Sequence, residues 1–173
     1  MSKQLRVAAI ATALALAALS TSAPQAQGQG AFTVLESGQS FSRLQDAVNA
    51  IGDGAGRISI APGTYRQCAV QEGGEIAYLA VEPGSAIFDG VECEGKAALV
   101  LRGRGADISG LVFQNMRVSD YNGAGIRLER GNLTVAQSWF RDSEQGILTA
   151  DGTAARIVID RSTFSRLGTC EGS

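Results

Sequence analysis

The spacing of apolar residues changes once along this chain, and the change separates one helix from a long series of short strands. The stretch SFSRLQDAVNAIGDG, which starts at Ser40, has helical periodicity. The apolar residues that would share one face of it are Phe41, Leu44, Val48 and Ile51. Ser40 is a suitable N-cap, and the glycines between 52 and 56 would end the helix. We therefore predict a helix over residues 40–51.

After this helix, apolar residues alternate with other residues and short phrases recur. The phrases ISIAPG, LAVEPG, LVLRG, IRLERG and ILTADG each place a triplet with inward, outward and inward residues before a glycine. Their first residues form one predicted inward column: Ile58, Leu79, Leu99, Ile126 and Ile147. In a second column, an aliphatic residue precedes a phenylalanine by five positions: Ile108 and Phe113, Val135 and Phe140, Ile159 and Phe164. The repeats start 20 to 27 residues apart.

Short strands repeated at this spacing predict a solenoid. If each strand stacks in parallel on its equivalent one coil later, neighbouring coils bury every inward column. The expected fold is all-β: a single-stranded parallel β-helix of about five coils that begins with the helix at 40–51. An antiparallel β-sandwich is the alternative, because it also has short strands and frequent turns. A sandwich, however, does not require the columns to keep register.

The opening phrases also resemble a known family. The residues that carry the resemblance are Ile60, Pro62, Gly63 and Tyr65, in the pattern I-x-P-G-x-Y, and the Gly-Ile pairs at 125–126 and 146–147. Together with the preceding helix, they resemble the pectin-lyase-like superfamily of right-handed parallel β-helices over roughly residues 33–167. The resemblance implies a right-handed solenoid whose N-terminal helix caps the first coil. The superfamily includes lyases, hydrolases, epimerases, tailspikes and non-catalytic adhesins, so the fold does not select an activity.

The N-terminus has the three parts of a secretory signal peptide, which we assign to residues 1–26. Positive charges precede an apolar run from Val7 to Leu19, and small residues come after it. This run is shorter than the ~20 residues that a spanning helix needs, although an N-terminal membrane anchor is the alternative. We expect an exported protein, periplasmic or secreted, with a leader and first strand at 27–39 and the β-helix at 40–173.

The composition narrows the classes of partner and chemistry. The chain has no histidine, which excludes Ser-His-Asp triads and histidine metal sites. Its 15 basic residues include Lys3 and Arg6 of the signal, so 13 basic and 17 acidic residues remain after cleavage. Such a chain has no basic footprint for nucleic acid. No membrane span is expected once the signal is removed.

The cysteines and the C-terminal end both bear on whether the β-helix is complete. Cys68 and Cys93 lie 25 residues apart, close to one coil, which favours a disulfide between adjacent coils; two buried free thiols are the alternative. Cys93 is also expected in the column of Phe113 and Phe140. Cys170 is left over, and no capping segment follows Phe164. We expect an N-terminal fragment of a longer β-helix, or an open end that pairs end to end with another copy, or a frayed last coil.

The outward-facing positions carry the candidate chemistry. The family's lyases hold calcium with clustered acids, so the resemblance implies calcium, but these columns contain no such cluster. Four residues are candidates for binding substrate: Asn115, Arg127, Trp139 and Asp142. With Arg166, Asn115 and Asp142 form the richest polar column, where a structural turn ladder is the alternative. Arg127 could contact a uronate carboxylate or pair with Glu129.

The remaining candidate, Trp139, is the only tryptophan and is predicted to point outward. It could stack on a sugar ring, or a neighbouring loop could cover it. The resulting hypothesis is an exported protein that binds or processes an acidic polysaccharide, as polysaccharide lyases do. The alternative is a non-catalytic structural or adhesive module. No catalytic residue can be assigned from the sequence.

Overall fold

The computed structural model describes residues 30–168, in which parallel strands form three stacked sheets. The predicted signal at 1–26 and Cys170 lie outside the described residues. Sheet A contains β1 (Phe32–Val34), β2 (Gln39–Phe41), β3 (Ala55–Ile60), β6 (Glu75–Ala80), β9 (Gly105–Ser109), β12 (Asn132–Ala136) and β15 (Ile157–Asp160). Sheet B contains β4 (Gly63–Tyr65), β7 (Ala86–Asp89), β10 (Leu111–Gln114), β13 (Trp139–Arg141) and β16 (Thr163–Ser165). Sheet C contains β5 (Ala69–Gln71), β8 (Ala97–Leu101), β11 (Ala124–Leu128) and β14 (Gln145–Thr149).

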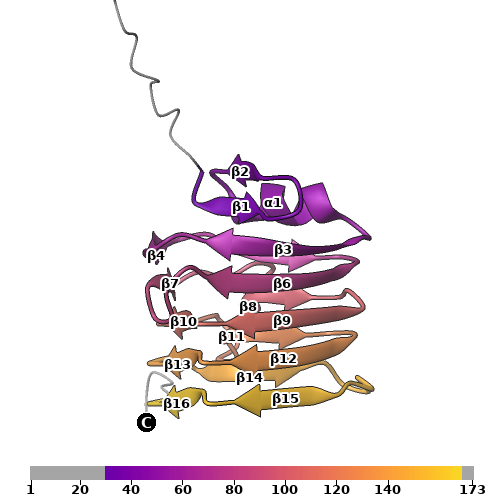
Figure 1. Cartoon of the computed structure of the whole chain (residues 1–173). Helices are drawn as coiled ribbons and strands as arrows, with labels where there is room; N and C mark the ends of the chain where they lie inside the picture. The colour runs from indigo at the N-terminus through magenta and orange to yellow at the C-terminus, as the bar shows by residue number, and fades with distance from the viewer. Residues whose placement is uncertain (1–29, 169–173) are drawn as a thin grey trace, which may run out of the picture.

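The chain visits the sheets in a fixed rotation. It passes from sheet A to B to C and then returns to A one layer further on, as in β6, β7, β8 and then β9, β10, β11. Neighbouring strands of these layers pair in parallel, whereas β1 pairs antiparallel with both β2 and β3. The layers therefore succeed one another from the end at α1 to the end at β15 and β16 (Figure 1). This arrangement is compatible with a parallel β-helix.

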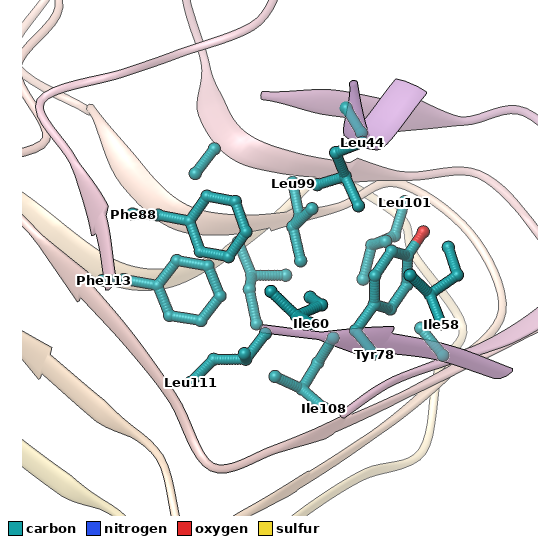
Figure 2. Close-up of a cluster of buried hydrophobic side chains, with 14 of the residues drawn as sticks. Leu44, Ile58, Ile60, Tyr78, Phe88, Leu99, Leu101, Ile108, Leu111 and Phe113 are labelled. Carbon is teal, nitrogen blue, oxygen red and sulfur yellow. The ribbon is translucent and has the colours of Figure 1, made fainter. Parts of the chain in front are cut away.

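The core is built from columns of inward side chains in register. Phe113 of sheet B pairs with Phe88 and Phe140, and Phe140 pairs in turn with Phe164. Ring centroids of successive members lie 4.8 to 5.5 Å apart along these four phenylalanines. Aliphatic columns from sheets A and C face this one, and together they fill the interior between the three sheets (Figure 2). The predicted register of Phe113, Phe140 and Phe164 is confirmed.

The first predicted column was wrong, because it joined strands of two different sheets. Ile58 belongs to sheet A, whereas Leu99 and Ile126 belong to sheet C. The partner of Ile58 in the next layer is Tyr78, which is fully buried, and Leu79 points to the other face. Alternation fixes only which residues share a face of one strand. It does not determine which sheet the strand joins. Because Leu79 is more apolar than Tyr78, the pattern assigned the inward position to Leu79 instead of Tyr78.

The predicted helix exists but begins later than expected. Helix α1 spans Leu44–Ile51, and it is the only helix within residues 30–168. Ser40 is not its cap: it lies in β2, where its hydroxyl hydrogen-bonds the hydroxyl of Thr33 across the strand pair. The first helical N–H, that of Leu44, instead donates to the side chain of Gln67, 3.0 Å away. Residues 40 and 41, which the local pattern assigned to the helix, thus form part of β2 because they pair antiparallel with β1.

Helix α1 lies beside the first layer at one end of the stack (Figure 1). Its buried residues are Leu44, Ala47 and Val48, and its neighbours include β1 and β5. The last layer, β15 and β16, is far more exposed: all four residues of β15 are exposed. The two ends of the stack therefore differ in how their apolar side chains are covered.

Candidate functional site

The outer face of sheet C carries a second, smaller apolar cluster. Its buried members are Ala97, Val100 and Ala124, packed with Val70, Cys93 and Leu148. The disulfide between Cys68 and Cys93, whose Cα atoms are 5.5 Å apart, ties the segment before β8 to the segment before β5. The prediction that Cys93 belongs to the phenylalanine column was wrong, because Phe88 is the partner of Phe113 in that column. The predicted spacing was counted from Leu79 as if it were equivalent to Leu99, but Leu79 lies in sheet A and Leu99 in sheet C.

Arg127 lies on this outer face, in register with Val100 and Leu148. Its Nε atom is buried and makes no hydrogen bond within the described residues. The nearest acid is Glu129, whose Oε1 is 3.9 Å from that Nε. Arg127 is thus held beside a carboxylate without being fully paired to it, and an unsatisfied buried N–H is costly unless a ligand or water satisfies it.

An ion-pair network surrounds Glu129 at the end of β11. Glu129 accepts hydrogen bonds from Lys96 Nζ at 2.7 Å and from Arg102 Nε at 2.6 Å. Arg102 also pairs with Glu94 and Glu72, so one guanidinium joins acids from three successive layers. Hydrogen bonds from Arg102 and Lys96 lower the pKa of Glu94 to about 2. Those from Lys96 and Arg102 lower the pKa of Glu129 as well.

Next to this network lies a hollow of about 420 Å³, at the corner where the chain passes from sheet C to sheet A. We call it the arginine hollow. It is lined by Arg102, Arg104 and Arg130, by the acidic residues Asp53 and Glu72, and by Gly73, Gly74, Gly103 and Gly131. A Cβ atom on Gly103 or Gly131 would lie 2.3 Å from an atom of the neighbouring layer, so only glycine fits at these two positions. The floor of the hollow is therefore main chain.

Two arginines of the hollow bind main-chain oxygens rather than acids. Arg104 donates to the carbonyls of Asp53 and Gly54, and Arg130 donates to those of Arg102 and Glu72. Within residues 30–168 neither forms a salt bridge. A guanidinium has five N–H donors, so each retains donors and an unneutralised charge. These groups can take up a carboxylate or another planar anion.

The corner between sheets B and C holds Asn115 and Asp142, two of the sequence candidates. We call Asp89, Asn115, Asp142 and Arg166 the corner ladder. Asn115 donates to Asp89 at 2.6 Å, while Asp142 pairs with Arg166, which lowers the pKa of Asp142. Asn115, Asp142 and Arg166 all have positive φ, between 50° and 59°. These repeated left-handed residues and their mutual bonds have the form of a turn ladder.

Trp139 lies on the outer face of sheet B and is half-buried. Its indole ring lies against the turn at Gly84, where an added Cβ would come within 3.4 Å of the ring. Trp139 and Arg127 thus belong to different sheets, and neither is in the corner ladder. The four sequence candidates are not gathered in one site.

A third polar site lies beside the corner ladder. The buried carboxylate of Glu144 accepts hydrogen bonds from the N–H groups of Val118 and Gly123, which fixes the protruding segment between β10 and β11. A hollow of about 310 Å³ lies here, lined in part by Arg117 and Tyr121. Glu144 is engaged by the main chain, so its first role is to shape this segment.

Sequence reasoning missed Arg102, Arg104 and Arg130. One signal could have found them: arginines flank the glycines of LRGRG and LERG at equivalent turns of successive repeats. Within residues 30–168, no three Cys, Asp or Glu side chains are grouped so that they could hold a metal ion. In the same range, no helix is both long and apolar enough to cross a membrane. Comparisons with protein-family models, curated proteins and solved structures give no match for this chain.

Proposed function

We propose that this chain is an exported right-handed parallel β-helix module of the pectin-lyase-like class, and that it binds an acidic polysaccharide. The rotation of the chain through three sheets in stacked layers supports the fold. The I-x-P-G-x-Y phrase and the N-terminal helix support the class, and the signal-like N-terminus supports export to the periplasm or beyond the cell. We place the binding site in the arginine hollow.

One observation carries this proposal: Arg104 and Arg130 are held by main-chain carbonyls and, among the residues that the structure describes, have no acidic partner. The net charge of the whole chain is −2, so a local site for an anion must come from such an arrangement rather than from overall charge. A glycine floor lets a flat, polar ligand approach the main chain closely. A uronate residue combines a planar carboxylate with hydroxyls that could bond to this floor.

Arg127 extends the proposed site along the outer face of sheet C. Its buried Nε needs a partner, and Glu129 and Lys96 beside it offer an acceptor and a donor for sugar hydroxyls. Under this proposal a polymer would lie across successive layers, from the arginine hollow towards Arg127. Cleavage of the polymer, as in the lyases that the sequence resembles, is a further step that the experiment below tests separately.

The test is calorimetric titration of the purified chain with polygalacturonate and alginate, with dextran as the neutral control. The double variant Arg104→Gln, Arg130→Gln should weaken binding by about 2 kcal/mol, or roughly 30-fold, because charge-assisted hydrogen bonds are lost. The matched control is Arg66→Gln, Arg166→Gln, which removes the exposed charge of Arg166 in the corner ladder and that of Arg66 beside it. It should leave the affinity unchanged.

The other outcomes assign the function differently. If the control variant weakens binding and the hollow variant does not, the site is the corner ladder and our placement is wrong. If neither acidic polymer binds, the alternative of a non-catalytic structural or adhesive module is supported. Ultraviolet absorbance of unsaturated sugars, released when the polymers are supplied, would indicate that the chain processes the polysaccharide as a lyase.

A further inference from the structure

Within residues 30–168, the last layer of the stack has an edge strand with apolar side chains. In this range sheet A ends at β15 and sheet B at β16. Ile157, Val158, Ile159 and Phe164 are 38 to 48% exposed, although their equivalents one layer earlier, such as Leu133, Val135 and Phe140, are buried. An exposed edge of this kind is a template for pairing with another strand.

The main chain of β15 is oriented so that only two residues present their polar groups to the open side. The carbonyls of Arg156 and Asp160 accept hydrogen bonds from Leu133 and Gln137 and therefore face β12. Because successive residues of a strand direct their N–H and C=O to opposite sides, those of Ile157 and Ile159 face away from β12. The side chains of Ile157 and Ile159 point to the interior, in register with Leu133 and Val135.

We propose that β15 pairs antiparallel with β15 of a second copy of this chain, on a two-fold axis through Val158. In this register Ile157 faces Ile159 of the second copy, so the outward N–H and C=O groups of both residues are satisfied in each chain. Arg156 then faces Asp160 of the second copy in a non-hydrogen-bonded pair, where side chains approach most closely. Moving the axis by half a residue would place Arg156 opposite Arg161 instead.

The groups needed for this pairing are available. Asp160 bonds Arg161 of its own chain through Oδ2, which leaves Oδ1 for a partner, and both side chains are exposed. Arg156 forms no salt bridge within residues 30–168. The register centred on Val158 thus satisfies the outward main-chain groups, places isoleucines opposite each other and pairs Arg156 with Asp160.

The opposite end of the molecule explains why the contact would close as a dimer. Helix α1 and the antiparallel pair β1–β2 lie at that end, and β2 carries the polar residues Gln39 and Ser40 (Figure 1). A head-to-tail contact would therefore bring an apolar edge onto a polar one. A two-fold contact uses the apolar edge of β15 twice, so a third copy cannot pair with this edge. This inference concerns a different surface from the arginine hollow and is independent of polysaccharide binding.

The first experiment measures the mass of the full chain by light scattering over a range of concentrations. We expect a dimer whose dissociation constant rises about 10-fold in Arg156→Asp and also in Asp160→Arg, since each places like charges opposite one another twice in the dimer. The double variant Arg156→Asp, Asp160→Arg should restore the original value. A monomer at every concentration, or a dimer indifferent to the single changes, overturns the proposal.

The second experiment does not depend on affinity. Val158→Cys, in a Cys170→Ser background, puts a thiol next to its own symmetry mate on the two-fold axis, so mild oxidation should give a covalent dimer. Thr134→Cys in the same background is the matched control, because Thr134 is the exposed equivalent of Val158 one layer away. Cross-linking of the control to the same extent, or no cross-linking of Val158→Cys, would contradict the register.

Discussion

At the N-terminal end of the stack, Phe32 is fully buried, and α1 and β3 are its neighbours. Its ring lies 5.0 Å from that of Tyr65, which in turn lies 5.6 Å from that of Phe88, so Phe32 begins a series of rings that continues through the phenylalanine column. At the other end, Phe164 ends this series and stacks on Phe140 at 4.8 Å, yet it is 41% exposed. The same residue type in one series of rings is thus core at one end and surface at the other. The difference comes from the element that covers each layer rather than from the side chain itself.

This contrast is a general property of stacked repeats. Each layer buries only its neighbours, so a terminal layer has half of the contacts of an internal one. At the N-terminal end an element outside the repeat, α1, supplies the missing half. At the other end the apolar side chains of β15 and β16 lack such a cover within residues 30–168, which is the basis of the pairing that we propose.

The largest expected effect is that of a substitution in the middle of the phenylalanine column. Phe113 is fully buried between Phe88 and Phe140. Phe113→Ala should lower the free energy of unfolding by about 3–5 kcal/mol through lost burial and the cavity left behind. The measurement is urea denaturation monitored by circular dichroism.

Phe164→Ala is the matched control for this prediction. It removes the same ring from the same column, but from a half-covered position, so it should cost only about 1 kcal/mol in the monomer. The comparison should be made at a concentration at which the chain is monomeric, because the proposed dimer would bury this end. Equal losses from the two changes would contradict the view that the ends of the stack differ.

The sequence predicted this column because phenylalanine recurs with little competition from other aromatic residues. It failed at Leu79, where an apolar residue stands next to the inward Tyr78, and at Ser40, where β2 takes the place of a helical turn. In both cases pairing with another strand overrode the local pattern: β6 pairs with β3 of the preceding layer, and β2 pairs with the nearby β1. The register of such pairing depends on turn lengths that vary between layers, and alternation alone cannot supply them.

The second prediction concerns the disulfide between Cys68 and Cys93, in the part of the stack towards α1. Replacing both Cys68 and Cys93 by Ala should lower the free energy of unfolding by about 3 kcal/mol, because the closed loop constrains the unfolded chain. Hydrogen exchange should accelerate around β5 and β8, which the bond connects, and remain slow in β12. Reduction of the unmodified protein should reproduce the loss. An unchanged stability after reduction would show that the bond has no such role.

The candidate site was less predictable than the fold. Arg127 could be placed on an outward face from alternation alone, and Glu129 could be named as its neighbour. The arginine hollow could not, because its arginines lie at the turns of two layers and its glycine floor comes from three. A site made by turns that stack one above another becomes visible only when the length of every turn is known.

The smallest expected effect comes from removing an arginine from each of two ion-pair sites in different parts of the stack. Glu94 belongs to the three-layer network around Arg102, whereas Glu36 pairs with Arg57 alone near the N-terminal end. Hydrogen bonding to these arginines lowers the pKa of each acid to about 2, from an ordinary value of 4.5. A lowered folded-state pKa stabilises the fold above pH 4.5, and this contribution is lost as the pH falls from about 4.5 to about 2.

We expect Arg102→Gln to lower the melting temperature at pH 7 more than Arg57→Gln does. Arg102 is 21% exposed and holds three acids, whereas Arg57 is 58% exposed and its isolated pair is screened by solvent. Between pH 4.5 and pH 2 the melting temperature of Arg102→Gln should also fall less steeply than that of the unmodified chain. The measurement is thermal unfolding by calorimetry across this range at low and high salt. If Arg57→Gln flattened the profile as much as Arg102→Gln, the network would contribute no more than a single surface pair.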